Sequence, residues 1–155
     1  MKKLFILIIS LLITVGVIYY FGFYTYFSKT EIHEQLPTSS KQGSEMKNIA
    51  TGNFGEVDLI HKGSGEAKLI EIDGKTILRF ENFSVTSGPD LYVYLSDSPN
   101  PMNNLGDLGN YANLGLLKGT IGSQNYEVPD NAKNYRTAII WCQKFGVLFS
   151  FALMK

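Results

Sequence analysis

A run of 24 residues without a charged side chain, from Leu4 to Phe27, constrains this chain more than any other feature. About 20 consecutive apolar residues are enough for a helix to cross the hydrocarbon core of a bilayer. We therefore expect a transmembrane anchor over residues 4–27. A cleaved signal peptide is the alternative, because Lys2 and Lys3 precede an apolar stretch. The length of the run and its aromatic end favour the anchor.

The residues around this run predict the topology. Lys2 and Lys3 precede it, and tyrosines gather near its end, as in the aromatic belt of a membrane interface. Because basic residues favour the cytoplasmic side, we expect a cytoplasmic stub over residues 1–3 and a single-pass protein of the cell membrane whose C-terminal part is extracytoplasmic. Residues 28–47 are polar and rich in turn formers, which indicates a linker. The folded domain then covers residues 48–155.

Alternating apolar and polar residues predict that this domain is all-β. The segment EAKLIEIDGKTILRF contains two such runs around Asp73–Gly74, which suits a type I′ hairpin turn. With a two-residue loop, Leu69 lies opposite Leu78. Ala67 then lies opposite Phe80 on the same face. About seven or eight such strands, separated by Gly, Pro, Asn and Asp, predict an antiparallel β-sandwich preceded by one N-terminal transmembrane helix.

The charge balance excludes one class of partner. The chain has 14 Lys and Arg residues, and without Lys2 and Lys3 the remaining 12 face 14 Asp and Glu residues. The sequence has no Lys/Arg cluster that would neutralise phosphates, so we expect no nucleic-acid partner. It also offers no catalytic triad or acid–base pair. An electron carrier or a binding module therefore describes the chain better than a stand-alone enzyme.

Cys142 is the only cysteine and follows the only tryptophan, Trp141, in the closing stretch AIIWCQKFGVLFSFALMK. If Phe145 and Gly146 form a two-residue turn, or if the loop around them has four residues, Cys142 pairs with Phe149 and shares a face with Ile140 and Phe151, so that the thiol is buried. A three-residue turn would place Trp141 beside Phe149 instead. From the residues alone, Cys142 is a core side chain, a cofactor ligand or a redox thiol.

His61 stands where a strand runs into the Gly-rich turn of LIHKGSGEA. Its imidazole is either a surface side chain near a hairpin or a ligand. One cysteine and one histidine cannot complete a usual zinc site without carboxylates, so we expect no metal site of that kind. Thiolate and imidazole are both axial ligands of haem iron. The cofactor is thus unknown from the sequence, with haem as the candidate for Cys142 and His61.

Four blocks follow one another along the chain: GNFGEVDLIHKGSGEAKLI, LRFENFSVTSGPDLYVYLS, LKGTIGSQNYEVPD and YRTAIIWCQKFGVLFSFALM. Together they resemble the DM-thirteen electron-transfer domain family over about residues 51–154. The resemblance implies an extracytoplasmic all-β module that is often attached to membranes. The family's near-invariant cysteine corresponds to Cys142, and the histidine before its SG block corresponds to His61. The implied role is electron transfer through the bare thiol or through a bound group such as haem.

Two functional hypotheses follow. In the first, the chain is a membrane-anchored extracytoplasmic redox module, with Cys142 as thiol or cofactor ligand, His61 as a second ligand and a separate redox partner protein. In the second, it is a non-catalytic extracellular module that presents loops such as residues 97–110 to a protein or a glycan. Cys142 then only fills the core.

Overall fold

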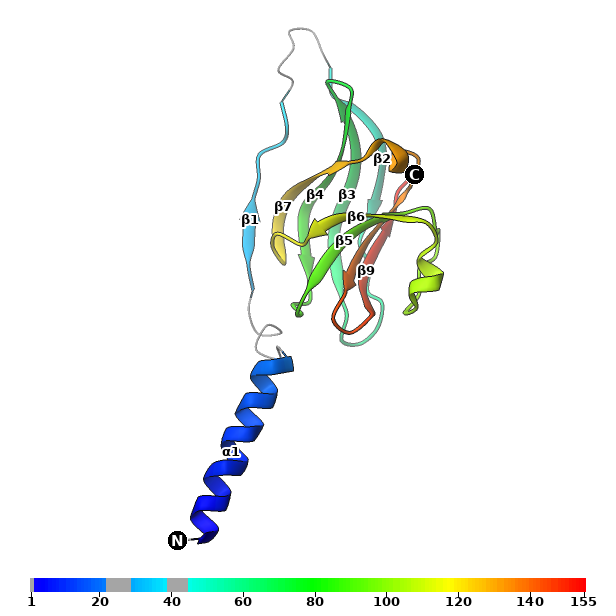
Figure 1. The fold of residues 1–155 in the computed structure, drawn as a ribbon. Helices are drawn as coiled ribbons and strands as arrows, with labels where there is room; N and C mark the ends of the chain where they lie inside the picture. Colours follow the sequence, from blue (N-terminus) through cyan, green and yellow to red (C-terminus); the bar gives the residue numbers. More distant parts are fainter. Residues whose placement is uncertain (1, 22–28, 39–44) are drawn as a thin grey trace.

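A computed structural model describes residues 2–21, 29–38 and 45–155. Helix α1 (Lys2–Phe21) is long and apolar enough to cross a membrane, and residues 2–20 are exposed on all sides. The helix forms because its run of Leu, Ile and Phe contains no proline. It extends away from one end of a β-rich domain (Figure 1). The end of the predicted anchor, residues 22–27, lies outside the described residues.

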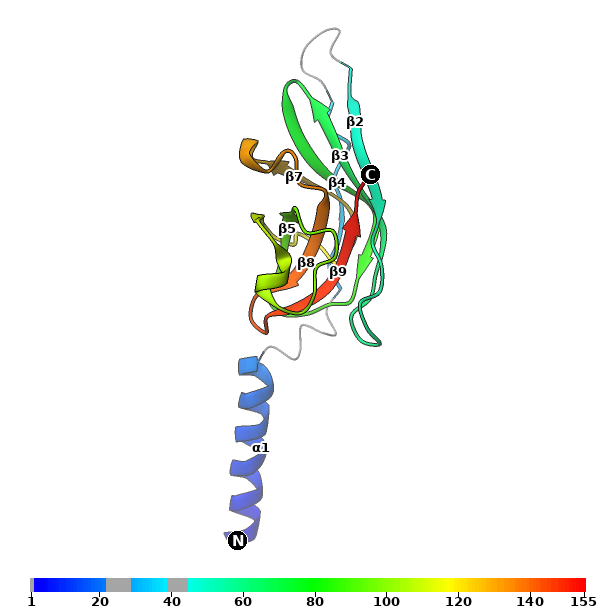
Figure 2. The same cartoon turned by 90° about the vertical axis from the view of Figure 1, so that its right-hand side faces the viewer.

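The described residues form nine strands in two sheets that pack face to face (Figure 2). The first sheet has the order β1 (Glu31–His33), β7 (Ile121–Val128), β4 (Lys75–Val85), β3 (Gly63–Ile72) and β2 (Lys47–Asn53). The second has the order β6 (Tyr111–Leu116), β5 (Leu91–Ser96), β8 (Thr137–Cys142) and β9 (Val147–Leu153). The described residues also include the short 3-10 helices η2 (Leu105–Leu108) and η3 (Asp130–Ala132). Only the β1–β7 pair among the described strands is parallel, so the predicted antiparallel β-sandwich is confirmed.

Strands β3 and β4 form the hairpin that the sequence predicts. The Asp73–Gly74 turn has positive φ values of 54° and 83°, which a glycine adopts without a Cβ clash. The register pairs Leu69 with Leu78. It also pairs Ala67 with Phe80. All four side chains are fully buried, so the predicted face of the hairpin is confirmed.

Strand β8 is buried on both faces, which explains why its sequence is apolar throughout rather than alternating. Ala138, Ile140 and Cys142 belong to the inner core between the two sheets. Ile139 and Trp141 belong to a second cluster, the outer cluster, on the other face of the second sheet. Side chains from η2 and from the β2–β3 connection pack into this outer cluster. The thiol and its neighbouring indole therefore lie in different parts of the core.

The segment predicted as a linker, residues 28–47, contains strand β1, which pairs with β7 at the edge of the first sheet. Strands β1 and β7 approach each other closely at Gly122. Its φ is 108°, and a Cβ at this position would collide with the carbonyl oxygen of Ile32. The segment predicted as a linker therefore includes a short strand that is bonded to the sheet. A strand of three residues is too short for an alternating pattern to reveal it.

Candidate functional site

Cys142 ends strand β8 and has no exposed surface. It pairs with Leu91 on β5 and with Val147 on β9, across a four-residue turn. The predicted pairing with Phe149 was wrong, because the turn is formed by residues 143–146 and lies closer to Cys142 than predicted. Farther from the turn, a β-bulge shifts the register between Ile140 and Trp141, so Ile140 pairs with Ser150 rather than with Phe149.

The bulge also changes which side chains share a face with Cys142. Ile140 lies in the inner core with Cys142, as predicted. Phe149 lies in the inner core too, although it is not the strand partner of Cys142. Phe151, predicted on the same face, packs against the outer cluster instead. The thiol is thus buried as expected, but among partly different neighbours.

The thiol of Cys142 is held in one position. Its Sγ donates a hydrogen bond to the carbonyl oxygen of Pro89 at 3.0 Å. Burial raises the pKa of this thiol, and hydrogen bonds from the backbone N–H groups of Phe145 and Lys144 offset only part of the rise. Cys142 is therefore a neutral thiol at pH 7 and not a resting thiolate nucleophile.

His61 lies in the β2–β3 connection, and its side chain contacts both this loop and the inner core. Its Nδ1 lies 2.7 Å from Asp58 Oδ2, and its ring packs on Phe149 with the ring centroids 4.4 Å apart. Only 14% of the His61 side chain is exposed. The hydrogen bonds from the His61 side chain and from the backbone of His61 and Ile60 lower the pKa of Asp58 to about 2. His61 is thus a packed, hydrogen-bonded residue and not a free surface histidine.

Cys142 and His61 do not frame a space for haem. The ring of Phe149 packs on His61, and a Cβ on Gly88 would lie 2.6 Å from Phe149 Cζ. Gly88 precedes Pro89, whose carbonyl oxygen accepts the hydrogen bond of the thiol. The Phe149 ring therefore fills the space between the two candidate ligands, and these residues do not fit a haem bound by both. Within the described ranges, no group of three or more His, Cys, Asp or Glu side chains could hold a metal ion.

Oxidisable aromatic side chains lie on the outer face of the second sheet, opposite the inner core that holds Cys142. Trp141 and Tyr94 belong to the same outer cluster. Tyr94 stacks on the exposed Tyr111 with ring centroids 4.7 Å apart, and its hydroxyl accepts a hydrogen bond from Gln143 Nε2 at 3.2 Å. The sequence analysis missed this aromatic series. The alternating tyrosines of LYVYLS were its only local signal.

A groove of about 260 Å³ lies beside the segment that covers the thiol. Its walls include Gly88, Asp90 and Leu91, which flank Pro89, and Leu91 pairs with Cys142 at the end of β8. Thr30, just before β1, and Leu117 also line the groove. The groove gives a partner access to the backbone around Pro89, although the sulfur itself stays covered.

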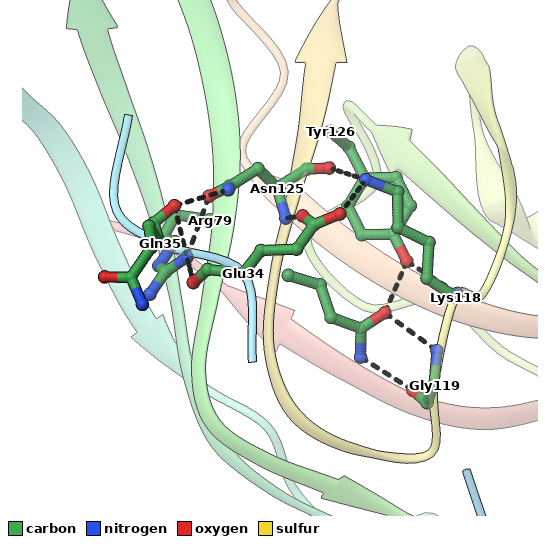
Figure 3. Close-up of polar contacts among 8 residues, drawn as sticks. Glu34, Gln35, Arg79, Lys118, Gly119, Asn125 and Tyr126 are labelled. Atoms are coloured by element: carbon green, nitrogen blue, oxygen red, sulfur yellow. Dashed lines mark hydrogen bonds and ion pairs between the residues drawn. The ribbon is translucent and has the colours of Figure 1, made fainter. Parts of the chain in front are cut away.

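A polar cluster, which we call the β1 clamp, fastens the chain after β1 to the first sheet (Figure 3). Glu34 Oε1 accepts a hydrogen bond from Lys118 Nζ at 2.7 Å, and its Oε2 accepts one from the backbone N–H of Asn125 at 2.7 Å. Burial tends to raise the pKa of Glu34, but the hydrogen bonds from Lys118 and Asn125 outweigh it and lower that pKa. The clamp therefore holds an ionised carboxylate.

Arg79 completes the β1 clamp from strand β4. Its guanidinium is almost fully buried and donates to the backbone carbonyl of Glu34 at 2.8 Å and to Asn125 Oδ1 at 3.0 Å. It also reaches the carbonyl of Gln35 and the carboxylate of Glu81, both at 3.4 Å. The sequence analysis missed the β1 clamp. A charged residue in the middle of the apolar run ILRF was the available signal.

Comparison with protein-family models identifies the family of this chain. Residues 53–154 match the electron transfer DM13 family, which covers both sheets except β1 and most of β2. The chain therefore belongs to the electron transfer DM13 family. The matched region includes Cys142 and His61 but neither α1 nor β1. Comparison with curated proteins and with solved structures gives no significant match.

Proposed function

We propose that the chain is a membrane-anchored extracytoplasmic module that transfers electrons through Cys142. Membership of the electron transfer DM13 family, with Cys142 inside the matched region, carries this proposal. The apolar helix α1, preceded by Lys2 and Lys3, supports an uncleaved anchor with the β-sandwich outside the cell membrane. The fixed thiol and the aromatic series beside it support Cys142 as the redox group.

The raised pKa of Cys142 determines the form of the redox step. A neutral thiol loses an electron most readily together with its proton, because the alternative is a buried sulfur radical cation. The S–H bond breaks, one electron passes to a one-electron acceptor, one proton passes to water at the β8–β9 turn, and a neutral thiyl radical remains. A one-electron donor and a proton from water restore the thiol. The acceptor and donor are metal centres of a separate redox partner protein.

The aromatic series supplies the route to such a partner. Trp141 is the covalent neighbour of Cys142, and Tyr94 and Tyr111 continue from its cluster to the exposed face of the second sheet. Indole and phenol side chains are oxidised at potentials near that of a thiol. Each of them can therefore be oxidised transiently to a radical as the electron passes. Electron transfer therefore requires no exposure of the sulfur.

The test is one-electron oxidation of the full chain in detergent, followed by rapid freezing and electron paramagnetic resonance of the frozen sample. We expect a trapped sulfur radical in the wild type and none in Cys142→Ala. The matched variant Tyr111→Phe keeps the stacked ring but removes the phenol, so it should slow the appearance of the sulfur radical without abolishing it. Identical signals from the wild type and from Cys142→Ala would overturn the assignment of Cys142.

The burial of Cys142 favours a second candidate function. A fully buried, hydrogen-bonded thiol with a raised pKa is also what a structural core residue looks like. The chain would then be a non-catalytic binding module that presents loops such as residues 97–110 to a protein or a glycan. In that case Cys142→Ala keeps every binding activity of the chain, and no radical forms at sulfur in the wild type.

A further inference from the structure

Two aliphatic side chains project from the tip of the β2–β3 connection. Leu59 is 92% exposed, the highest value among the large hydrophobic residues in the described part of the chain, and its neighbour Ile60 is 65% exposed. Single exposed apolar residues are common on the surfaces of soluble proteins. Two adjacent ones at the tip of a loop expose a larger apolar area, and a partner that covers both would remove more of it from water than one that covers a single residue. The pair has no role in the proposed electron transfer.

The tip is held in a shape that keeps both side chains outside. The carboxylate of Asp58 accepts hydrogen bonds from the backbone N–H groups of Ile60 and His61, each at 2.7 Å. Thr86 Oγ1 donates to the carbonyl of Ile60 at 2.9 Å, and the His61 ring is packed on Phe149. The exposure of the pair is therefore built into the fold rather than left to a loose loop.

The tip lies at the end of the sandwich that faces helix α1. In both views the β2–β3 connection and the β8–β9 turn lie at the end of the sandwich nearer to the helix, while the β3–β4 hairpin points the other way (Figures 1 and 2). Lys144 in the β8–β9 turn donates from Nζ to the backbone carbonyl of Tyr20 at 2.9 Å. Its neighbour Phe145 is 39% exposed and adds a third apolar side chain to this end.

The tether between helix and sandwich keeps this end close to the membrane. Thr30 is already bound to the domain, since its backbone N–H donates to Thr120 Oγ1 at 3.1 Å. From Phe21 to Thr30 the chain spans about 30 Å at most, even when fully extended. A sandwich attached so near the membrane cannot keep its α1-facing end far from the lipid.

Charge near the tip indicates which layer of the membrane it meets. Lys62 pairs with Glu56 at 3.0 Å, and Asp58 pairs with His61, so acidic and basic side chains are mixed there. Such a surface has no preference for anionic lipid. Aliphatic side chains flanked by lysines are instead typical of the boundary between headgroups and acyl chains, where lysine stems extend toward water.

We propose that Leu59 and Ile60, together with Phe145, insert into the interfacial layer of the bilayer that holds α1. This inference rests on the proposed anchoring of the chain by α1. The sandwich would then lie against the lipid surface, with the β8–β9 turn that follows Cys142 turned toward the membrane. A second copy of the chain or another protein on the same tip is the competing occupant.

The test places a tryptophan at the tip of the full chain in phosphatidylcholine vesicles. Leu59→Trp and, separately, Ile60→Trp report contact with lipid brominated near the headgroup end of the acyl chains, which quenches tryptophan. Glu71→Trp, exposed near the distant β3–β4 hairpin, is the matched control. The native Trp141 is buried and adds the same background to every variant.

We expect brominated lipid to reduce the added emission of both tip variants, with a shift to shorter wavelength, and to leave the Glu71→Trp emission unchanged. Unquenched tip variants, or equal quenching of Glu71→Trp, would overturn the insertion. Crosslinking between two copies through the tip without quenching would do the same in favour of a dimer. Alkaline extraction of the same vesicles tests the anchor separately, because release of the chain would contradict the proposed anchoring itself.

Discussion

The β1 clamp and the Cys142 site lie in one small domain, but the first favours the charged form of its ionisable group and the second favours the neutral form. In the clamp, cations and backbone donors surround Glu34 and lower the pKa of its carboxylate. At Cys142, burial raises the pKa of the thiol, whose hydrogen-bond acceptor is the carbonyl of Pro89. Ionised groups thus fasten the segment that follows β1, whereas the proposed redox group stays neutral. The clamp should respond to charge removal and acid, and the thiol site should not.

The largest expected effect comes from removing the buried cation of the clamp. Arg79→Met keeps much of the side-chain volume but leaves the carbonyl of Glu34 and the side chain of Asn125 without their donor. We expect a loss of about 3 kcal/mol in the free energy of unfolding, the usual cost of breaking a buried ionic network. Urea unfolding of the full chain in detergent, followed by Trp141 fluorescence, measures it.

The control for this variant is Lys75→Met on the same strand. Lys75 forms an exposed ion pair with Glu127 at 3.0 Å, so its loss should change the free energy of unfolding by less than about 1 kcal/mol. Equal effects of the two variants would contradict the view that burial gives the clamp its strength.

A smaller effect is expected at the thiol. Cys142→Ala removes one buried sulfur and its hydrogen bond to Pro89, which should reduce the free energy of unfolding by about 1 kcal/mol. The same urea titration measures the loss, and Cys142→Ser, which keeps a donor for Pro89, is the matched variant. If Cys142→Ala were as destabilising as Arg79→Met, the thiol would contribute as much to the stability of the fold as the β1 clamp does. The expected difference between the two sites would then be contradicted.

The smallest expected effect is the acid response of Glu34. Its pKa is lowered from 4.5 in the folded state, so its contribution to stability is complete above the unfolded-state pKa and is lost as the pH falls through the folded pKa. Between about pH 5 and pH 3, the wild type should therefore lose up to about 1 kcal/mol more stability than Glu34→Gln. Urea midpoints across this pH range give the comparison. Parallel curves for the two proteins would show that Glu34 does not carry the acid response.

The β3–β4 hairpin could be predicted from the sequence because all of its determinants are local. Asp73 and Gly74 specify the turn, and alternation specifies the face of Leu69 and Leu78. The register of β8 and β9 could not be predicted, since the sequence does not show that the turn is formed by residues 143–146 or that a bulge lies near Phe149. Sequence reasoning thus placed Cys142 in the core but gave it the wrong strand partner.

The β1 clamp shows the other limit of sequence reasoning. Glu34 and Lys118 are 84 positions apart, and the polar composition around Glu34 is the same as that of a solvated linker. Only the folded sheet shows that Arg79 points toward this segment. Long-range polar pairs have no periodicity, so their partners appear only when the strands are in place.

The parallel pairing of β1 with β7 has a mechanical consequence. Helix α1 precedes the N-terminal end of β1, and the C-terminus lies toward the other end of the sandwich (Figure 1). With α1 as the proposed membrane anchor, a pull between the membrane and the C-terminus would run along β1 and load its bonds to β7 in shear. Bonds in shear share the force and break together, whereas bonds in a peeled strand break one after another. The clamp thus makes the attachment of the domain resistant to tension, and the first sheet bears that tension before Cys142 does.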